Sequence, residues 1–210
     1  MKKTIITPKG TSAKSQLLEL YEYRELIYLL SLRDIKVKYS QAIVGIAWTI
    51  IIPVINLLIL ILVFDKVAGI QTLGLPYPVF AISGVAAWIY FSETLTGSSQ
   101  SLIANQNLIK KIYFPRLIIP ISKTIPPLVD LGIAILVLLI LATYYQTPMT
   151  ANLQLLFLHA AMLFLCSLTG GIWISAISIR FRDFSYTLPF IMRLLFFVSP
   201  IGYPLNTIPE

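Results

Sequence analysis

The sequence predicts an all-α fold, a polytopic transmembrane helical bundle with an N-terminal helix at the membrane interface. Of its 210 residues, 57% are hydrophobic and only 12% are charged, about half the charged fraction of a soluble domain. The mean hydropathy is +0.83. Long uncharged runs alternate with short basic segments, and this alternation is typical of membrane spans joined by loops.

Residues 1–40 form the first predicted region, a polar cytoplasmic tail followed by an interfacial helix. On a helix, one narrow face gathers apolar and aromatic side chains: Tyr28, Leu32, Ile35 and Tyr39. The charged side chains spread over much of the remainder: Arg33, Asp34, Lys36 and Lys38. This pattern favours a helix lying in the membrane interface. A solvated helix that packs on a partner would give the same pattern.

Residues 41–210 form the predicted transmembrane domain. Its five expected spans are residues 42–64, 77–96, 117–143, 153–178 and 184–199. A helix needs about 20 residues to cross the hydrocarbon core, so the fifth span is short. Residues 97–100 are expected to form a loop, and Gly170 and Gly171 to allow close helix packing. Residues 200–210 hold three prolines and a glycine, which cannot continue a helix.

The basic residues predict the orientation of the chain. Thirteen of the sixteen Lys and Arg residues fall within residues 1–40, the segment 105–120 or the turn 180–183. If the N-terminus is cytoplasmic, these three segments lie on the cytoplasmic side of the membrane, and of the remaining basic residues only Lys66 lies on the outer side. Lys123 and Arg193 fall within spans. Since cytoplasmic loops carry the excess of positive charge, the N-terminus is expected to be cytoplasmic.

The segment 105–120, NQNLIKKIYFPRLIIP, is a basic island between two apolar runs. Its charges cannot be buried in lipid, so it is expected to lie in water on the cytoplasmic side. A loop this compact could be the surface on which a soluble partner pushes, or it could serve only to set the topology. The turn containing Arg180, Arg182 and Asp183 could contact a partner or a substrate head group, or only anchor itself.

Asp130 and Arg193 are ionisable residues within predicted spans, which makes each a functional hypothesis. Asp130 lies about 12 residues into its span and Arg193 about nine, so at ~1.5 Å per residue they reach a similar depth. We therefore expect them to pair or to face one aqueous path. Lys123 lies seven residues before Asp130, on nearly the same helix face. The alternative is that these charges are structural and lie in the bundle core.

The sequence offers no motif for chemistry of its own. The stretch GTSAKS at 10–15 only faintly resembles a nucleotide-binding loop, because Pro8 and Ala13 stand where glycines are needed. No catalytic residue set and no metal-ligating cluster is apparent. Because the basic residues cluster outside the apolar runs, as topology signals do, we expect no nucleic-acid partner.

Five ordered segments carry a resemblance to a known family. They are YRELIYLLSLRDIKVKYSQAIVGIAW, PYPVFAISGVAAWIYF, NLIKKIYFPRLIIP, RFRDFSYTLPF and SPIGYP. Together they resemble the membrane subunit of ABC-2-type bacterial polysaccharide exporters, which includes the O-antigen, capsular polysaccharide and teichoic acid permeases. The O-antigen exporters look nearest.

The resemblance implies an inner-membrane homodimer with two copies of an ATP-binding cassette subunit, which would bind ATP and Mg; this chain would bind no cofactor. The substrate would be a lipid-linked polysaccharide. The resemblance also implies six spans and a re-entrant outer segment beginning within 200–210, and the sequence stops before a sixth span. The alternatives are a membrane-embedded enzyme acting on lipid-linked sugars and an ion-coupled secondary transporter.

The resemblance assigns roles to particular residues. A coupling helix that docks on the ATP-binding subunit would comprise Leu108, Ile109, Lys110, Lys111, Ile112, Tyr113 and Phe114. Because the first and fifth spans line the channel in the family, Trp48 and Phe196 are candidates for an aromatic substrate path, together with Asp130 and Arg193. The alternative for these aromatic residues is an interfacial belt or packing against lipid.

Overall fold

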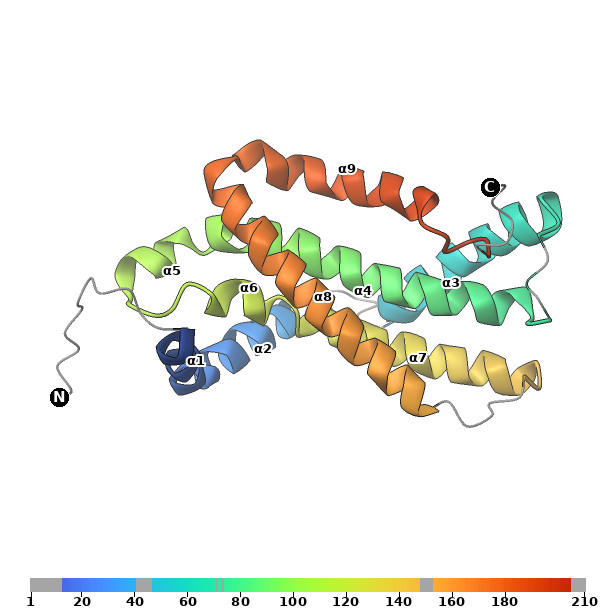
Figure 1. The fold of residues 1–210 in the computed structure, drawn as a ribbon, viewed down its shortest axis with the longest axis horizontal. Helices are drawn as coiled ribbons and strands as arrows, with labels where there is room; N and C mark the ends of the chain where they lie inside the picture. The colour runs from blue at the N-terminus through green and yellow to red at the C-terminus, as the bar shows by residue number, and fades with distance from the viewer. Residues whose placement is uncertain (1–12, 41–46, 71, 73, 148–152, 205–210) are drawn as a thin grey trace.

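The computed structural model describes residues 13–40, 47–70, 72, 74–147 and 153–204. Over these residues the chain is helical, contains no strand and forms an elongated bundle (Figure 1). The helices in chain order are α1 (Ala13–Glu22), α2 (Arg24–Ser40), α3 (Ala47–Leu60), the π-helical η1 (Ile61–Val67), α4 (Tyr77–Ala104), α5 (Gln106–Lys111), α6 (Ile118–Ser122), α7 (Pro126–Tyr144), α8 (Leu153–Arg180) and α9 (Arg182–Val198). The all-α prediction is confirmed.

Four helical segments of the described chain are long and apolar enough to cross a membrane. They are Ala47–Val67, Tyr77–Ala104, Ile118–Tyr144 and Leu155–Arg180. These correspond to the first four predicted spans. Helix α9 stands where the fifth span was expected, but its 17 residues are fewer than a full crossing needs. A polytopic helical bundle is therefore confirmed, while a crossing by α9 stays a prediction.

Helix α4 is the centre of the bundle and contacts α3, α6, α7, α8 and α9. It continues to Ala104, so the loop expected at 97–100 is wrong. The small polar side chains there are buried in helix contacts rather than exposed: Ser98 and Ser99 are almost fully covered. The Ser98 hydroxyl donates to the Pro120 carbonyl, and the Ser99 hydroxyl donates to the carbonyl of Thr96.

Helix α8 crosses α4 (Figure 1), and Gly170 and Gly171 of α8 lie against α4 at close range. A Cβ atom on Gly171 would lie 2.7 Å from the Ser98 Oγ, and one on Gly170 would lie 3.6 Å from a Leu95 methyl carbon. Only a residue without a side chain fits at 171. The expected close packing is therefore confirmed at Gly171, whereas a Cβ on Gly170 would make an ordinary contact.

The predicted third span is interrupted between α6 and α7. Pro126 and Pro127 have no N–H to donate, so they begin a new helix instead of continuing α6. The Ser122 carbonyl, which Pro126 cannot satisfy, accepts a hydrogen bond of 3.1 Å from the Ser31 hydroxyl of α2. Lys123 follows the last residue of α6. A helix from outside the span thus satisfies one of the backbone groups that the interruption frees.

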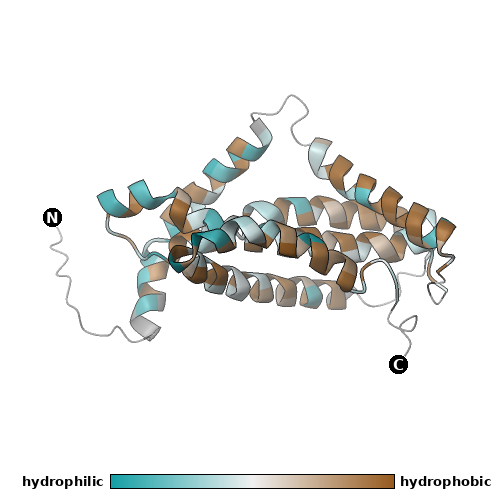
Figure 2. Ribbon diagram, turned by 90° about the horizontal axis from the view of Figure 1, so that it is seen from above, coloured by the Kyte–Doolittle hydropathy of each residue, from teal (hydrophilic) through white to brown (hydrophobic). Residues whose placement is uncertain are grey.

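Hydrophilic residues gather at the end of the bundle that carries α2 and α5, and apolar residues cover most of the remaining helix length (Figure 2). At the opposite end, the segment after α9 folds back onto the bundle. Gly202 lies against Phe64, and its carbonyl accepts from the Tyr77 hydroxyl at 2.8 Å. Residues 205–210, which belong to the expected start of the re-entrant segment, lie outside the described part of the chain.

Candidate functional site

The basic island forms a shorter helix than expected. Helix α5 covers Gln106–Lys111, so Ile112, Tyr113 and Phe114 lie outside it, which corrects the predicted helix 108–114. Pro115 disfavours a helix that continues through Phe114, because proline cannot donate to the preceding turn and biases the residue before it towards extended backbone. Ile112 already has extended dihedral angles.

The two faces of this segment have different environments. Phe114 is only 6% exposed and packs with Leu30 of α2 and with Ile118 and Ile119. Ile112 and Tyr113 are 58% and 53% exposed. Phe114 therefore anchors the segment to the bundle and cannot contact a partner, whereas the exposed side chains beside the two lysines can.

Helix α1 supports the same surface. The Tyr113 hydroxyl donates to Glu19 Oε1 over 3.2 Å. This hydrogen bond to a carboxylate raises the pKa of Tyr113 above its ordinary value. The exposed end of the island is thus connected to the N-terminal helices. Helices α1, α2 and α5 lie together at one end of the bundle (Figure 1), where hydrophilic residues gather (Figure 2), and we call these three helices the platform.

Helix α2 packs on the bundle mainly through a face beside the predicted apolar one. Leu30 and Ser31 are buried, and Leu26 and Ile27 pack beside them. On the predicted face, Tyr28 is largely exposed, whereas Leu32, Ile35 and Tyr39 are half-buried. That this helix lies in the membrane interface stays a prediction.

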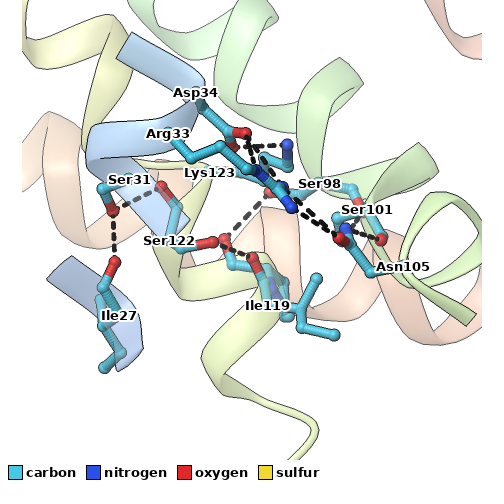
Figure 3. Close-up of polar contacts among 11 residues, drawn as sticks. Ile27, Ser31, Arg33, Asp34, Ser98, Ser101, Asn105, Ile119, Ser122 and Lys123 are labelled. Atoms are coloured by element: carbon cyan, nitrogen blue, oxygen red, sulfur yellow. Dashed lines mark hydrogen bonds and ion pairs between the residues drawn. The ribbon is translucent and has the colours of Figure 1, made fainter. Parts of the chain in front are cut away.

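One polar cluster joins α2 to the ends of α4 and α6 (Figure 3). The Lys123 ammonium lies 2.6 Å from Asp34 Oδ2, and Arg33 contacts the same carboxylate at 3.0 Å. Arg33 also donates to the side-chain oxygen of Asn105 at 3.4 Å. Lys123, expected within a span beside Asp130, is thus an anchor for α2. Lys36, also predicted on this helix, is exposed.

A second cluster lies one helical turn further along α2. Lys38 Nζ is 2.8 Å from Glu93 Oε2 of α4 and 2.5 Å from Asp130 Oδ2 of α7. The Tyr39 hydroxyl donates to the other Asp130 oxygen at 2.6 Å. Asp130 is 6% exposed. The expected pairing of Asp130 with Arg193 is wrong, because α2 places a nearer cation and a hydroxyl on this carboxylate.

The environment of this cluster shifts the titration of both α2 residues. Partial burial disfavours the charged Lys38 ammonium, but its hydrogen bonds to Asp130 and Glu93 outweigh burial, so its pKa is raised. Burial, together with the hydrogen bond to Asp130, raises the pKa of Tyr39 to about 12. Both groups therefore keep their protons at neutral pH, which holds the contacts in place.

The four substrate-path candidates line two separate cavities. Trp48 and Asp130 line a narrow cleft of about 70 Å³ between α2, α3, α4 and α7. Arg193 and Phe196 line a groove of about 780 Å³ between α3, α4 and α9. Lys38 and Glu93 belong to the lining of both. Among the described residues Arg193 has no ion-pair partner.

The groove has an aromatic part and a polar part. Trp88 packs against Phe196 with ring centroids 6.1 Å apart, and Phe197 stands edge-on to Phe196. The polar part of the lining comprises Lys38, Asn56, Ser92, Glu93, Thr96 and Arg193. Such a surface can contact a molecule that has both apolar faces and hydrogen-bonding edges.

The predicted charged turn is present between α8 and α9. Phe181 is the single residue between the two helices and has extended backbone. Arg180 stacks near its ring at 5.4 Å. Arg182 lines a shallow hollow together with Gln106 of α5, so the structure brings the turn next to the basic island. Asp183 is exposed in the first turn of α9.

Sequence reasoning missed the role of Glu93 and Tyr39 at the second cluster. One signal could have found it: Asp34 and Lys38 are four residues apart, so opposite charges lie on one face of α2. The carboxylates Glu93 and Asp130 lie in apolar spans and require cations, and this face of α2 carries the cation Lys38. Among the described residues, no group of three or more His, Cys, Asp or Glu side chains could hold a metal ion.

The chain is similar to known membrane transport proteins. A family model described as ABC-2 type transporter matches residues 25–210. The O-antigen export system permease protein RfbA of Myxococcus xanthus is 28% identical over 193 residues, which cover 91% of this chain and 73% of that protein. An RfbA permease of Klebsiella pneumoniae is 30% identical, with 89% and 71% covered. The polysialic acid transport protein KpsM of Escherichia coli is 27% identical, with 86% and 70% covered.

Proposed function

We propose, because this chain belongs to the ABC-2 type transporter family, that it is the channel-forming permease subunit of an ATP-driven exporter of lipid-linked polysaccharide. Its apolar helices make it a multi-pass membrane protein. The similar proteins are named for O-antigen export and polysialic acid transport. O-antigen is the glycan we favour, since the O-antigen permeases cover more of the chain.

The groove between α3, α4 and α9 is the observation that carries this proposal. A sugar ring has an apolar C–H face and polar edges, so it can slide along Trp88 and Phe196 without fixed hydrogen bonds. Arg193 lines the same groove and could contact an anionic group of the substrate bidentately. A second copy of this chain would close the open side of the groove to form the path of a homodimer.

The platform of α1, α2 and α5 supports the second part of the proposal, a partner that supplies the energy. Lys110 and Lys111 end α5, and Ile112 and Tyr113 beside them are exposed, which is the mixture of charge and apolar surface that a docking site uses. Two copies of an ATP-binding cassette subunit would bind ATP and Mg and push on this platform from the cytoplasm. The membrane would be the bacterial inner membrane, with the N-terminus cytoplasmic.

We assign no catalytic residue to this chain. Glu93 and Asp183 are the acids that an enzyme acting on lipid-linked sugars could use. Glu93 is held by Lys38, and Asp183 is exposed at the start of α9 with no ion-pair partner among the described residues. Neither arrangement provides the paired acid and base that such chemistry requires.

The test is reconstitution of the full chain with the ATP-binding subunit that co-purifies from the native host. Lys110→Glu with Lys111→Glu reverses the charge at two lysines of the platform, and Lys66→Glu reverses the charge of one exposed lysine outside it. The platform variant should lose co-purification and transport-linked ATP hydrolysis, whereas the control should keep both. Equal behaviour of the two variants would refute the docking role, and a chain that recruits no ATPase would refute the proposed function.

A further inference from the structure

Lys38 is held by two transmembrane helices at once. Its ammonium bridges Glu93 of α4 and Asp130 of α7, at 2.8 and 2.5 Å. Its neighbour Tyr39 donates to the same Asp130 carboxylate. Because Asp130 is buried, removal of its partners would leave an uncompensated charge within the bundle, which is strongly unfavourable. The last turn of α2, the middle of α4 and the beginning of α7 are therefore held together where they meet.

The platform side of α2 is connected to the bundle by separate contacts. One turn before Lys38, Asp34 pairs with Lys123 at the interruption between α6 and α7. Leu30 packs with Phe114, the anchor of the basic island. A displacement of the island would therefore reach α2 through Leu30. Along the rigid helix it would reach Lys38, and through Lys38 the two spans.

The pair of Lys38 and Glu93 also lies between the two cavities. Both residues line the narrow cleft that contains Asp130, and both line the large groove. The ion pair is thus part of the wall that separates the cleft from the groove. A movement of α2 that withdraws Lys38 would join the two spaces and widen the groove on the α2 side.

We propose that Lys38 is a positioning residue for transport, which couples movement of α2 to spans α4 and α7 and closes the groove on the α2 side. This inference rests on the proposed function. Its structural basis is a single ammonium shared by carboxylates from two spans, on a helix that also packs on the anchor of the platform. ATP-driven displacement of the platform changes the width of the groove only while Lys38 contacts Glu93 and Asp130.

The experiment compares Lys38→Met with Lys66→Met in the full complex with its ATP-binding subunit in proteoliposomes. Lys66 pairs with Asp65 at 3.5 Å and is exposed, so the control removes a lysine from an ion pair outside the cluster. ATP hydrolysis and translocation of the native lipid-linked glycan are measured in the same vesicles. Lys38→Met should hydrolyse ATP at the wild-type rate but translocate about tenfold less glycan per ATP, a typical size for coupling between sites. The control should match the wild type in both.

A triple variant separates coupling from folding. Lys38→Met combined with Glu93→Gln and Asp130→Asn removes all three charges, so no unpaired carboxylate remains to destabilise the bundle. It should assemble and hydrolyse ATP while translocating as poorly as Lys38→Met. Wild-type translocation per ATP in either variant would overturn the inference, as would a loss that only follows the amount of folded complex. Absence of ATP-driven translocation in the wild-type complex would instead overturn the proposed function.

Discussion

The crossing of α4 and α8 predicts opposite effects for the same substitution at two glycines. Gly171→Ala in α8 would place a methyl group 2.7 Å from the Ser98 Oγ and 3.1 Å from its Cβ. Both distances are shorter than ordinary contacts, and Ser98 is buried, so the helices must separate. Gly132→Ala in α7 adds the same methyl group where no heavy atom lies within 4 Å. The two variants differ only in whether the space exists.

The expected difference can be estimated from this geometry. Overpacking of a close contact costs about 1–3 kcal/mol of unfolding free energy, and the shift required at Gly171 places it within that range. An alanine at a helical position with free space gains up to ~1 kcal/mol over glycine. Gly171 is also helical and makes the same gain, so the gain cancels between the two variants. Gly171→Ala should therefore be about 1–3 kcal/mol less stable than Gly132→Ala, which is the overpacking cost alone.

Reversible unfolding of the reconstituted chain in mixed micelles measures these free energies. The double variant Ser98→Gly, Gly171→Ala removes the side chain that the new methyl group meets. Compared with Ser98→Gly alone, the added alanine should then cost little, which isolates the contact as the cause. Equal stability of the Gly171→Ala and Gly132→Ala proteins would refute the argument that this glycine permits the close approach.

Three further predictions concern the anchor of the basic island, the contacts that Lys38 and Tyr39 make with Asp130, and the groove. Phe114→Ala removes the buried anchor of the basic island and should speed tryptic cleavage there, with a stability loss of about 3 kcal/mol in the same unfolding assay; an unchanged cleavage rate would contradict the anchor role. The pKa of Lys38 is raised from 10.5 and that of Tyr39 from 10.0 to about 12, so their contribution to stability is complete below about pH 10 and declines as the pH rises towards 12. The free energy of unfolding, measured from pH 8 to 12, should show this decline in the wild type and a weaker decline in Lys38→Met. Parallel curves for the two proteins would count against a stabilising role of the Lys38 contacts. Arg193→Gln should lower translocation but not the free energy of unfolding, whereas Asp130→Asn should lower the free energy of unfolding. A loss of stability in Arg193→Gln and none in Asp130→Asn would contradict the roles given to these two residues.

The sequence was a good guide wherever charge alone decides position. Lys110 and Lys111 lie on a platform at the polar end of the bundle, and the apolar runs became the long helices. The turn around Phe181 was also predictable, since two arginines and an aspartate interrupt two apolar runs. The tight approach at Gly171 followed from the absence of a side chain.

The wrong predictions share a physical cause: tertiary contacts, rather than the local sequence, determined the structure around these residues. Ser98 and its neighbours look like loop residues by composition, yet they fit a helix because α8 passes close beside them. Counting residues from the membrane surface predicts a depth for Asp130 but not the direction in which it points. Its partner Lys38 is 92 residues away in sequence, and the charge pattern of α2 indicates a cation for a buried carboxylate without fixing which carboxylate it contacts.

The bond from Ser31 to the Ser122 carbonyl has a consequence for biogenesis. The donor is synthesised 91 residues before its acceptor, so this hydrogen bond can form only after α3 and α4 have been made. Until it forms, the proline-interrupted span keeps an unsatisfied carbonyl, which lipid tolerates poorly. The order of synthesis therefore makes this bond one of the later contacts of α2, after its contact with Glu93 of α4 becomes available.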